Sequence, residues 1–363
     1  MPDYLRLFAL FGIVVVNVQF FAFSIDAASG GAATNGQTDV FVKWLVEGLA
    51  TLKSYGLFSF MFGVGLGFLM QSADRRGLEF GPLYRRRMIG LLILGILHGT
   101  TFFYGDILVI YAVMGSFLYL MRGWAVGRLV RFGAFFLGLG VLVAAVLSLG
   151  DEGIPKDFLN YELSVLSEGG FFDVFIFRSI AFGIVFVLGF FFQGITALGW
   201  FCLGLAAVKS GIIDNSDHVV WRRARQFALA PGLALSLYAG WLIATGGSIL
   251  GSVIQVIAAP VATFGYLGLI ALIATSPGPL MQTMLKSGGS SLTIYLGQSI
   301  VLSFIFAPYG LGLWSQLSYS AAVLIAIGIT LALICGVTLW RRRFRLGPFE
   351  AIFRRFTYGA PAA

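Results

Sequence analysis

Long apolar segments, separated by short polar or charged loops, recur from one end of this sequence to the other. The longest has about 30 residues, and about 20 apolar residues suffice for a helix to cross the hydrocarbon core of a bilayer. Because these runs do not alternate as strands do, they predict an all-α, polytopic integral membrane helix bundle with about ten transmembrane helices. The ten predicted segments are Tyr4–Ser24, Ser54–Ser72, two runs within Tyr84–Arg122, Leu129–Leu149, Ser179–Val208, Phe227–Thr245, Ile249–Ala274, Ser291–Pro308 and Ala321–Trp340.

Composition and charge fit the same class. Hydrophobic residues make up 58% of the chain and charged residues 11%, whereas a soluble domain carries about 25% charged residues. The net charge of +8 would suit nucleic acid, but the basic residues flank apolar segments, so no nucleic-acid partner is expected. With the N-terminus on the cytoplasmic side, nearly all of the 24 Lys and Arg residues fall on that side, which predicts that both termini are cytoplasmic. The exceptions are Lys43, Lys53, Lys156 and Arg178.

The sequence predicts a single transmembrane domain over residues 1–363, in four parts. Residues 1–149 hold the first five helices, 150–178 an outer connector, 179–340 the other five helices and 341–363 a cytoplasmic amphipathic tail. In the tail, an apolar stripe at helical spacing predicts a helix lying on the inner leaflet. The stripe consists of Phe349, Ile352, Phe353 and Phe356.

Two further stretches complete the prediction, and the first of them allows two arrangements. Residues 179–208 form either one tilted helix or two pieces broken near Gln193–Gly194, and we expect one crossing. Just before the predicted segment Ser54–Ser72, apolar residues recur at helical spacing and charged residues occupy other positions around the helix. This pattern predicts an interfacial helix. The apolar face is Phe41, Trp44, Leu45, Leu49 and Leu52, and the charged positions are Lys43, Glu47 and Lys53.

Three glycines, Gly63, Gly65 and Gly67, share part of the spacing of a dinucleotide-binding fingerprint. No strand precedes them and no βαβ unit surrounds them, so that function is excluded. Small residues that let helices pack closely are the expected explanation.

His98 and Asp106 are the candidate catalytic residues. His98 lies about 11 residues past Arg87, near the predicted bilayer midplane, where an ionisable side chain is costly and marks a functional position by default. The alternative to a functional role is a neutral imidazole that is hydrogen-bonded to a neighbouring helix. Asp106 follows Gly105 at the reversal between the two runs, where it either caps the next helix or belongs to the site.

Five more polar residues are candidates for substrate binding. Arg178, the only arginine predicted on the outer side, could hold an anion or pair with Asp106 or Glu47. The five candidates are Arg178, Asn17, Gln298, Tyr295 and Glu47. For each taken singly, hydrogen bonding between helices is the alternative. The sequence has no metal-ligand spacing, serine triad or phosphate loop, so no metal site is predicted.

Several motifs, in order along nearly the whole length, are similar to those of one family. They are Asp3-x-x-Arg6 with FALFGIVVVN, FSFMFGVGLGF, YRRR…GILH…GDILVIYAV, SSLTIYLGQS and FRLGPFEAIFRRFTYG. The chain thereby resembles the YeiB-like bacterial membrane proteins (domain of unknown function 418). The resemblance implies a multi-pass protein of the bacterial inner (cytoplasmic) membrane, related to the wider group of transmembrane acyltransferases. Asn17 stands where many O-acyltransferases have a histidine, and His98 and His218 are the only histidines here.

Two functional classes are compatible with these residues. In the first, a membrane-embedded acyltransferase-like enzyme modifies a sugar, lipid or cell-envelope acceptor, with His98 as general base and Asp106 orienting it or holding substrate. The donor is acyl-CoA or a lipid-borne acyl group, and a cytoplasmic donor would need a channel because the polar residues lean outward. The alternative is a transporter or lipid-handling protein without catalysis. Membrane lipids and an envelope glycan or lipid are the expected partners, and the sequence is compatible with an oligomer.

Overall fold

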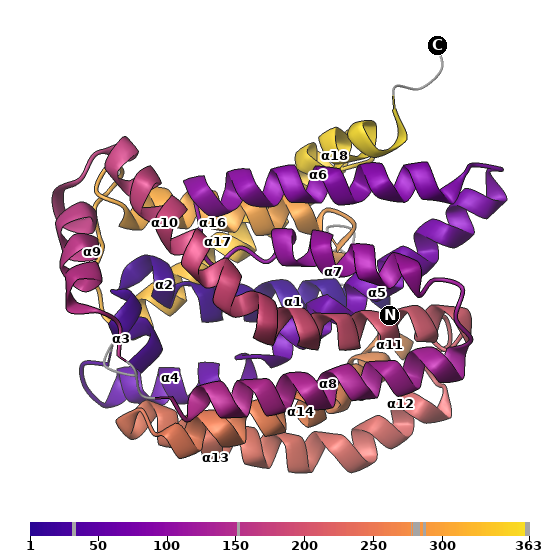
Figure 1. Cartoon of the computed structure of the whole chain (residues 1–363), viewed down its shortest axis with the longest axis horizontal. Helices are drawn as coiled ribbons and strands as arrows, with labels where there is room; N and C mark the ends of the chain where they lie inside the picture. The colour runs from indigo at the N-terminus through magenta and orange to yellow at the C-terminus, as the bar shows by residue number, and fades with distance from the viewer. Residues whose placement is uncertain (31–33, 151–152, 277, 279–283, 286–287, 360–363) are drawn as a thin grey trace.

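The structure is a computed structural model that describes residues 1–30, 34–150, 153–276, 278, 284–285 and 288–359. It consists of helices that run roughly along one axis (Figure 1). No β-strand occurs in these residues. Figure 1 shows α3 and α9 at one end of the bundle and α12 at the other. In chain order the elements are α1 (Pro2–Asn17), α2 (Gln19–Ala22), α3 (Ile25–Gly30), α4 (Gln37–Leu49), α5 (Lys53–Arg75), α6 (Phe80–Thr101), α7 (Leu108–Leu120), α8 (Val126–Ser148), α9 (Lys156–Glu168), α10 (Phe171–Gly189), the π-helix η1 (Phe190–Gly194), α11 (Ile195–Lys209), α12 (Val219–Ala224), the π-helix η2 (Arg225–Leu229), α13 (Ala230–Gly246), α14 (Ile249–Thr275), α16 (Ser291–Phe306), α17 (Tyr319–Trp340) and α18 (Pro348–Tyr358).

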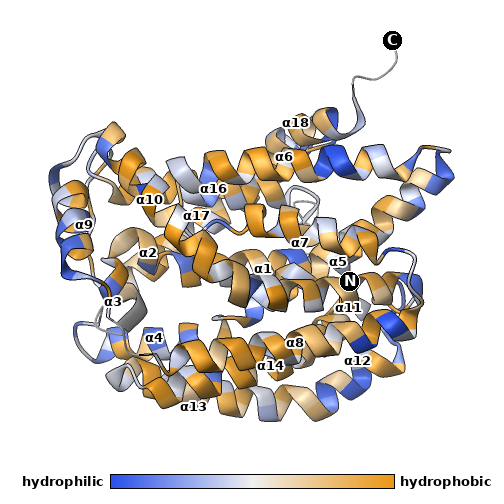
Figure 2. Cartoon of the chain, viewed as in Figure 1, coloured by the Kyte–Doolittle hydropathy of each residue, from blue (hydrophilic) through white to orange (hydrophobic). Residues whose placement is uncertain are grey.

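Seven segments of the described chain are long and apolar enough to cross a membrane, by length and composition. Two further apolar helices, α7 and α16, are shorter. Hydrophobic residues cover most of the helices, while hydrophilic residues gather on α9, around α12 and on part of α6 (Figure 2). The predicted all-α, polytopic helix bundle is confirmed. The seven segments are Pro2–Ala22, Gln37–Arg75, Val126–Ser148, Phe171–Lys209, Val219–Gly246, Ile249–Thr275 and Tyr319–Trp340.

The long segment through α10, η1 and α11 is continuous over 39 residues, as one crossing requires. The Gln193–Gly194 pair, the other predicted position for a break, lies in the π turn η1. A π turn leaves backbone carbonyls without the usual helical partner. Here the carbonyl of Gln193 accepts a hydrogen bond from the Tyr55 hydroxyl at 2.7 Å, which ties this turn to α5.

Helix α4 differs from the interfacial helix predicted for this region. It packs against α13 and turns its charged side into the bundle. Lys43 is 1% exposed and Glu47 6%, whereas Phe41 is 55% exposed. The Glu47 carbonyl accepts hydrogen bonds from Lys53 Nζ at 2.8 Å and from Gln255 Nε2 at 2.5 Å. Inside the bundle, Lys53 thus has a hydrogen-bond partner, and Lys43 Nζ lies 5.7 Å from the centroid of the Tyr319 ring. Apolar side chains such as Phe41 can instead face lipid.

Helices α5 and α11 pack with almost no space between their backbones. A Cβ atom added to Gly63 would lie 2.1 Å from the carbonyl oxygen of Phe201, and one added to Gly204 would lie 2.1 Å from that of Phe60. A Cβ added to Gly65 would meet nothing within 4 Å. Gly63 therefore serves helix contact, as small residues do in membrane bundles, while Gly65 does not.

Candidate functional site

His98 and Asp106 form a buried hydrogen-bonded pair where α6 ends and α7 begins. His98 Nδ1 lies 2.8 Å from Asp106 Oδ1, and the two residues are 3% and 4% exposed. Asp106 Oδ2 also accepts from the Leu108 backbone N–H at 2.8 Å, so this carboxylate both orders the start of α7 and binds the imidazole. The Tyr295 hydroxyl donates to Asp106 Oδ1 at 3.1 Å and joins α16 to the pair.

These contacts define how the imidazole can act. A carboxylate accepts hydrogen bonds, so the proton on the neutral ring belongs on Nδ1, and Nε2 keeps its lone pair. Nε2 is buried and has no hydrogen-bond partner among the described residues. An imidazole held by a carboxylate on one nitrogen, with the other nitrogen unoccupied, has the arrangement of a general base.

A cavity of about 370 Å³ lies next to this pair, within the size range of about 300–1,000 Å³ typical of small-molecule sites. It is lined by residues of α1, α5, α6, α7, α16 and α18, together with short stretches between them. The lining residues are Arg6, Phe58, Phe62, Arg87, Leu91, Leu108, Tyr111, Gly288, Gly289, Ser291, Leu292, Tyr295, Leu346, Glu350, Phe353, Arg354, Thr357 and Tyr358.

The cavity is lined by cationic and aromatic side chains, together with the carboxylate of Glu350. Arg6, Arg87 and Arg354 contribute three guanidinium groups. Tyr295 lines the cavity and lies beside the buried pair, with its ring centroid 5.2 Å from that of His98. His98 itself does not line the cavity. Tyr295 and Leu108 line the cavity and both donate hydrogen bonds to Asp106, so they connect the cavity lining to the pair.

Most of the lining comes from the motifs that carry the family resemblance. Asp3-x-x-Arg6 supplies Arg6, and YRRR supplies Arg87. FSFMFGVGLGF, GDILVIYAV, SSLTIYLGQS and the final FRLGPFEAIFRRFTYG each supply two or more lining residues. Sequence reasoning did not select Arg87 and Arg354 as site residues, although their presence in these motifs was the available signal.

Helix α18 covers the cavity instead of only lying on a membrane surface. It packs on α6 and α16, and Figure 1 shows it alongside α6. A Cβ added to Gly90 on α6 would lie 2.9 Å from Phe353 and 3.0 Å from Phe356. Glu350 accepts hydrogen bonds from the Thr293 backbone N–H at 2.9 Å and from its hydroxyl at 2.5 Å. This carboxylate therefore fastens α18 to the start of α16.

Replacing Glu350 with alanine should loosen α18. The change removes two hydrogen bonds to a charged acceptor, each contributing about 1.5–3 kcal/mol, so opening of the helix should become at least about tenfold more frequent. Trypsin cleavage after Arg354 and Arg355 in the purified protein would report the opening. Ile352→Ala is the matched control, because Ile352 lies on the same helix and is 67% exposed. Equal cleavage of the two variants would contradict the assigned role of Glu350.

The remaining predicted residues lie apart from the pair, and their role in binding stays a prediction. Arg178 Nη1 donates to the Thr101 carbonyl, the Ser303 hydroxyl and the Tyr309 hydroxyl at 2.7–2.8 Å, and thereby ties α10 to the end of α6 and to α16. Gln298 lies one turn beyond Tyr295.

Gln298 Nε2 donates to Thr330 Oγ1 at 2.8 Å, which joins α16 to α17. Asn17 is half-buried at the last position of α1, and Glu47 belongs to the charged side of α4. Of the seven candidates, the structure thus brings His98, Asp106 and Tyr295 into direct contact.

Comparison with known proteins gives one consistent result. The family model described as "Protein of unknown function (DUF418)" matches residues 207–360. The uncharacterized protein YxaH of Bacillus subtilis (strain 168) is 30% identical, over 98% of this chain and 93% of the relative. The uncharacterized protein YeiB of Escherichia coli (strain K12) is 26% identical, over 99% of this chain and 96% of the relative. An uncharacterized 39.9 kDa protein from the amylase 3' region of Bacillus acidopullulyticus is 24% identical, over 98% and 92%.

Proposed function

This chain belongs to the DUF418 family of membrane proteins, and from that premise we propose that it is an acyltransferase-like enzyme of the bacterial inner membrane. The observation that carries the proposal is a cavity lined by three arginines and by a tyrosine that is hydrogen-bonded to a buried carboxylate–imidazole pair. The acceptor is a hydroxyl group of a sugar, a lipid or a cell-envelope precursor.

The three guanidinium groups suit a donor that carries phosphate. Arginine binds phosphate oxygens through paired N–H groups. Within the described residues Arg87 and Arg354 have no carboxylate at ion-pair distance, whereas Arg6 Nη1 already pairs with Asp3 Oδ1 at 2.7 Å, so a donor phosphate would share Arg6 with Asp3. Acyl-CoA has phosphates at one end and a thioester at the end of a narrow chain. With the phosphates against Arg6, Arg87 and Arg354, the chain would extend along the aromatic lining toward Tyr295.

The chemical step uses the two nitrogens of His98 differently. Nε2 accepts the proton of the acceptor hydroxyl while the oxygen attacks the acyl carbonyl carbon. The carbon–sulfur bond then breaks, and the thiolate of the donor takes the proton from the imidazolium. Asp106 holds Nδ1–H throughout and stabilises the transient positive charge. Because Nε2 is buried and His98 does not line the cavity, neighbouring side chains have to move for the acceptor to reach Nε2.

The side of the membrane also fits a cytoplasmic donor. YRRR and the arginine-rich tail belong to the side predicted as cytoplasmic, with both termini. With that topology, a cavity lined by Arg87 and Arg354 would be reached from the side that supplies acyl-CoA. A cytoplasmic donor would then not need the channel across the bundle that the outward-leaning polar residues had suggested.

Binding of acyl-CoA to the purified full-length protein tests the proposal. Arg87→Gln removes a charge-assisted contact to phosphate and should weaken binding by about tenfold or more. Arg128→Gln is the matched control, because Arg128 stacks on Trp124 at 3.9 Å and does not line the cavity. Isothermal titration with acetyl-CoA measures both. Binding that is absent in the unmodified protein, or equally weakened by both substitutions, would overturn the assignment of the donor site.

A further inference from the structure

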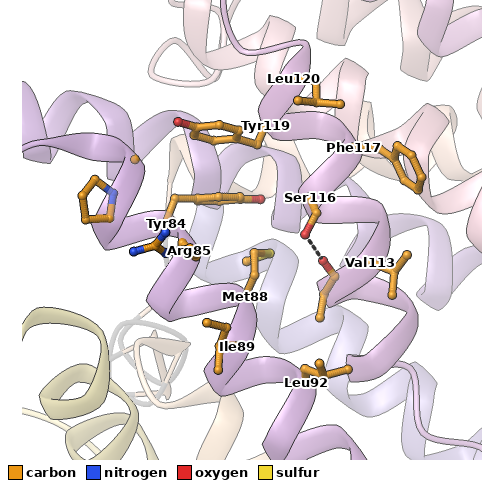
Figure 3. A pocket seen from close by; sticks show the side chains of 13 residues that line it. Tyr84, Arg85, Met88, Ile89, Leu92, Val113, Ser116, Phe117, Tyr119 and Leu120 are labelled. Carbon is orange, nitrogen blue, oxygen red and sulfur yellow. Dashed lines mark hydrogen bonds between the residues drawn. The ribbon is translucent and has the colours of Figure 1, made fainter.

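A second hollow, of about 830 Å³, lies along another face of the α6–α7 pair (Figure 3). Its lining comes from residues 81–92, mostly in α6, and from residues 112–120 of α7. We call it the lateral groove. Its labelled side chains in Figure 3 are Tyr84, Arg85, Met88, Ile89, Leu92, Val113, Ser116, Phe117, Tyr119 and Leu120.

The walls of the lateral groove are apolar and open to the surroundings. Ile89 is 43% exposed, Phe117 45% and Leu120 69%. The Ser116 hydroxyl already donates to the Ala112 carbonyl at 2.8 Å, the bond drawn in Figure 3. The Tyr84 hydroxyl likewise donates to the Gly115 carbonyl at 2.9 Å. Two of the polar groups of the groove are thus satisfied internally, which suits a hydrocarbon chain better than a sugar or a peptide.

One end of the lateral groove carries positive charge. Arg85 lines the groove next to Tyr84, whose ring stacks on that of Tyr119 with centroids 5.5 Å apart. The guanidinium of Arg122 lies 3.9 Å from the Tyr119 ring centroid on the α7 side. Within the described part of the chain, neither Arg85 nor Arg122 has a carboxylate at ion-pair distance, and no acidic residue lines the groove. Arg85 of α6 and Arg122, two residues past the end of α7, therefore have no carboxylate partner, and Arg122 uses Nη1 for one hydrogen bond, to the Tyr119 carbonyl at 3.0 Å.

We propose that the lateral groove binds an anionic phospholipid, with one acyl chain between α6 and α7 and the headgroup phosphate at Arg85 and Arg122. The groove extends from these arginines toward Leu92 and Val113. A lipid whose headgroup lies in the leaflet next to the arginines would therefore place its acyl chain along the groove. Arginines near the membrane surface attract anionic headgroups, and apolar side chains deeper in the membrane contact the acyl chains. The inference does not rest on the proposed enzymatic function, since lipid could bind here whether or not His98 is catalytic.

Photoreactive lipids test this site on the full-length protein. The protein is incubated in detergent with phosphatidylglycerol or phosphatidylcholine bearing a diazirine in one acyl chain, and adducts are mapped by mass spectrometry. We expect phosphatidylglycerol adducts on α6 and α7 around Ile89, Leu92 and Val113. Combining Arg85→Gln with Arg122→Gln should lower this labelling by about tenfold or more, because each arginine near the membrane surface changes lipid affinity by about fivefold.

Two further variants separate headgroup recognition from general exposure to lipid. Val113→Trp should fill the groove and remove the adducts while the arginines stay in place. Arg128→Gln, which removes another arginine stacked on an aromatic ring, should change nothing. Equal labelling by the two lipids in the unmodified protein, adducts mainly on other helices, or unchanged labelling after loss of both arginines would each overturn the proposal.

Discussion

Replacing Gly63 with leucine is expected to prevent the bundle from assembling, whereas the same replacement at Gly65, two residues away, is expected to leave it folded. The first added carbon at Gly63 would lie 2.1 Å from the Phe201 carbonyl oxygen, which is backbone of α11 and cannot rotate away. Overpacking in a close-packed core costs about 1–3 kcal/mol even where side chains can adjust, so we expect a larger loss here.

The comparison between Gly63 and Gly65 isolates the packing effect. Both residues lie within α5, so the gain in helix propensity from glycine to leucine is the same at both. Only at Gly63 does the new side chain meet another helix, since a Cβ at Gly65 has open space. The yield of monodisperse protein after detergent extraction, with its thermal midpoint, measures the difference. Two variants that behave alike would show that the close approach of α5 and α11 does not limit assembly.

The helix boundaries could be read from the sequence because they depend on local composition. The segment predicted at Ile249–Ala274 is α14, Ile249–Thr275, and that predicted at Ala321–Trp340 is α17, Tyr319–Trp340. A run of apolar residues long enough for a bilayer ends where charges or turn residues begin, and this is visible without tertiary information.

The facing of the helices could not be read in the same way. The pattern around Lys43 is that of an amphipathic helix in either environment, and only the partners supplied by α13, α14 and α17 decide that the charged side turns inward. The cavity is a similar case. Its arginines, Arg6, Arg87 and Arg354, are far apart in sequence, and each alone has the position of an ordinary charge beside an apolar segment.

The pair at the centre of the site was partly predictable. His98 and Asp106 are eight residues apart around a chain reversal, so the sequence already placed them in one hairpin. The contact between Asp106 and Tyr295 joins residues 189 positions apart. That contact brings α16 to the pair, and no local sequence pattern indicates it.

Replacing His98 with alanine should lower acyl transfer by about 10²–10⁴-fold, the usual contribution of a general base, while acyl-CoA still binds. Binding should persist because His98 does not line the cavity that holds the three arginines. Asp106→Asn should cause a loss of at least about a hundredfold. An amide can donate to Nδ1, which moves the ring proton to Nε2 and removes the lone pair needed to accept the proton of the acceptor.

His218→Asn is the matched control for the histidine substitution. His218 is half-buried at the start of α12, where its side chain accepts a hydrogen bond from the Val220 N–H at 3.3 Å, and asparagine can replace that cap. Transfer of a labelled acetyl group from acetyl-CoA to lipid and glycan fractions of membrane vesicles measures all three variants. Vesicles with His98→Ala that transfer label at the unmodified rate would assign the buried pair a structural role, joining α6, α7 and α16, because its removal would then leave the chemistry intact.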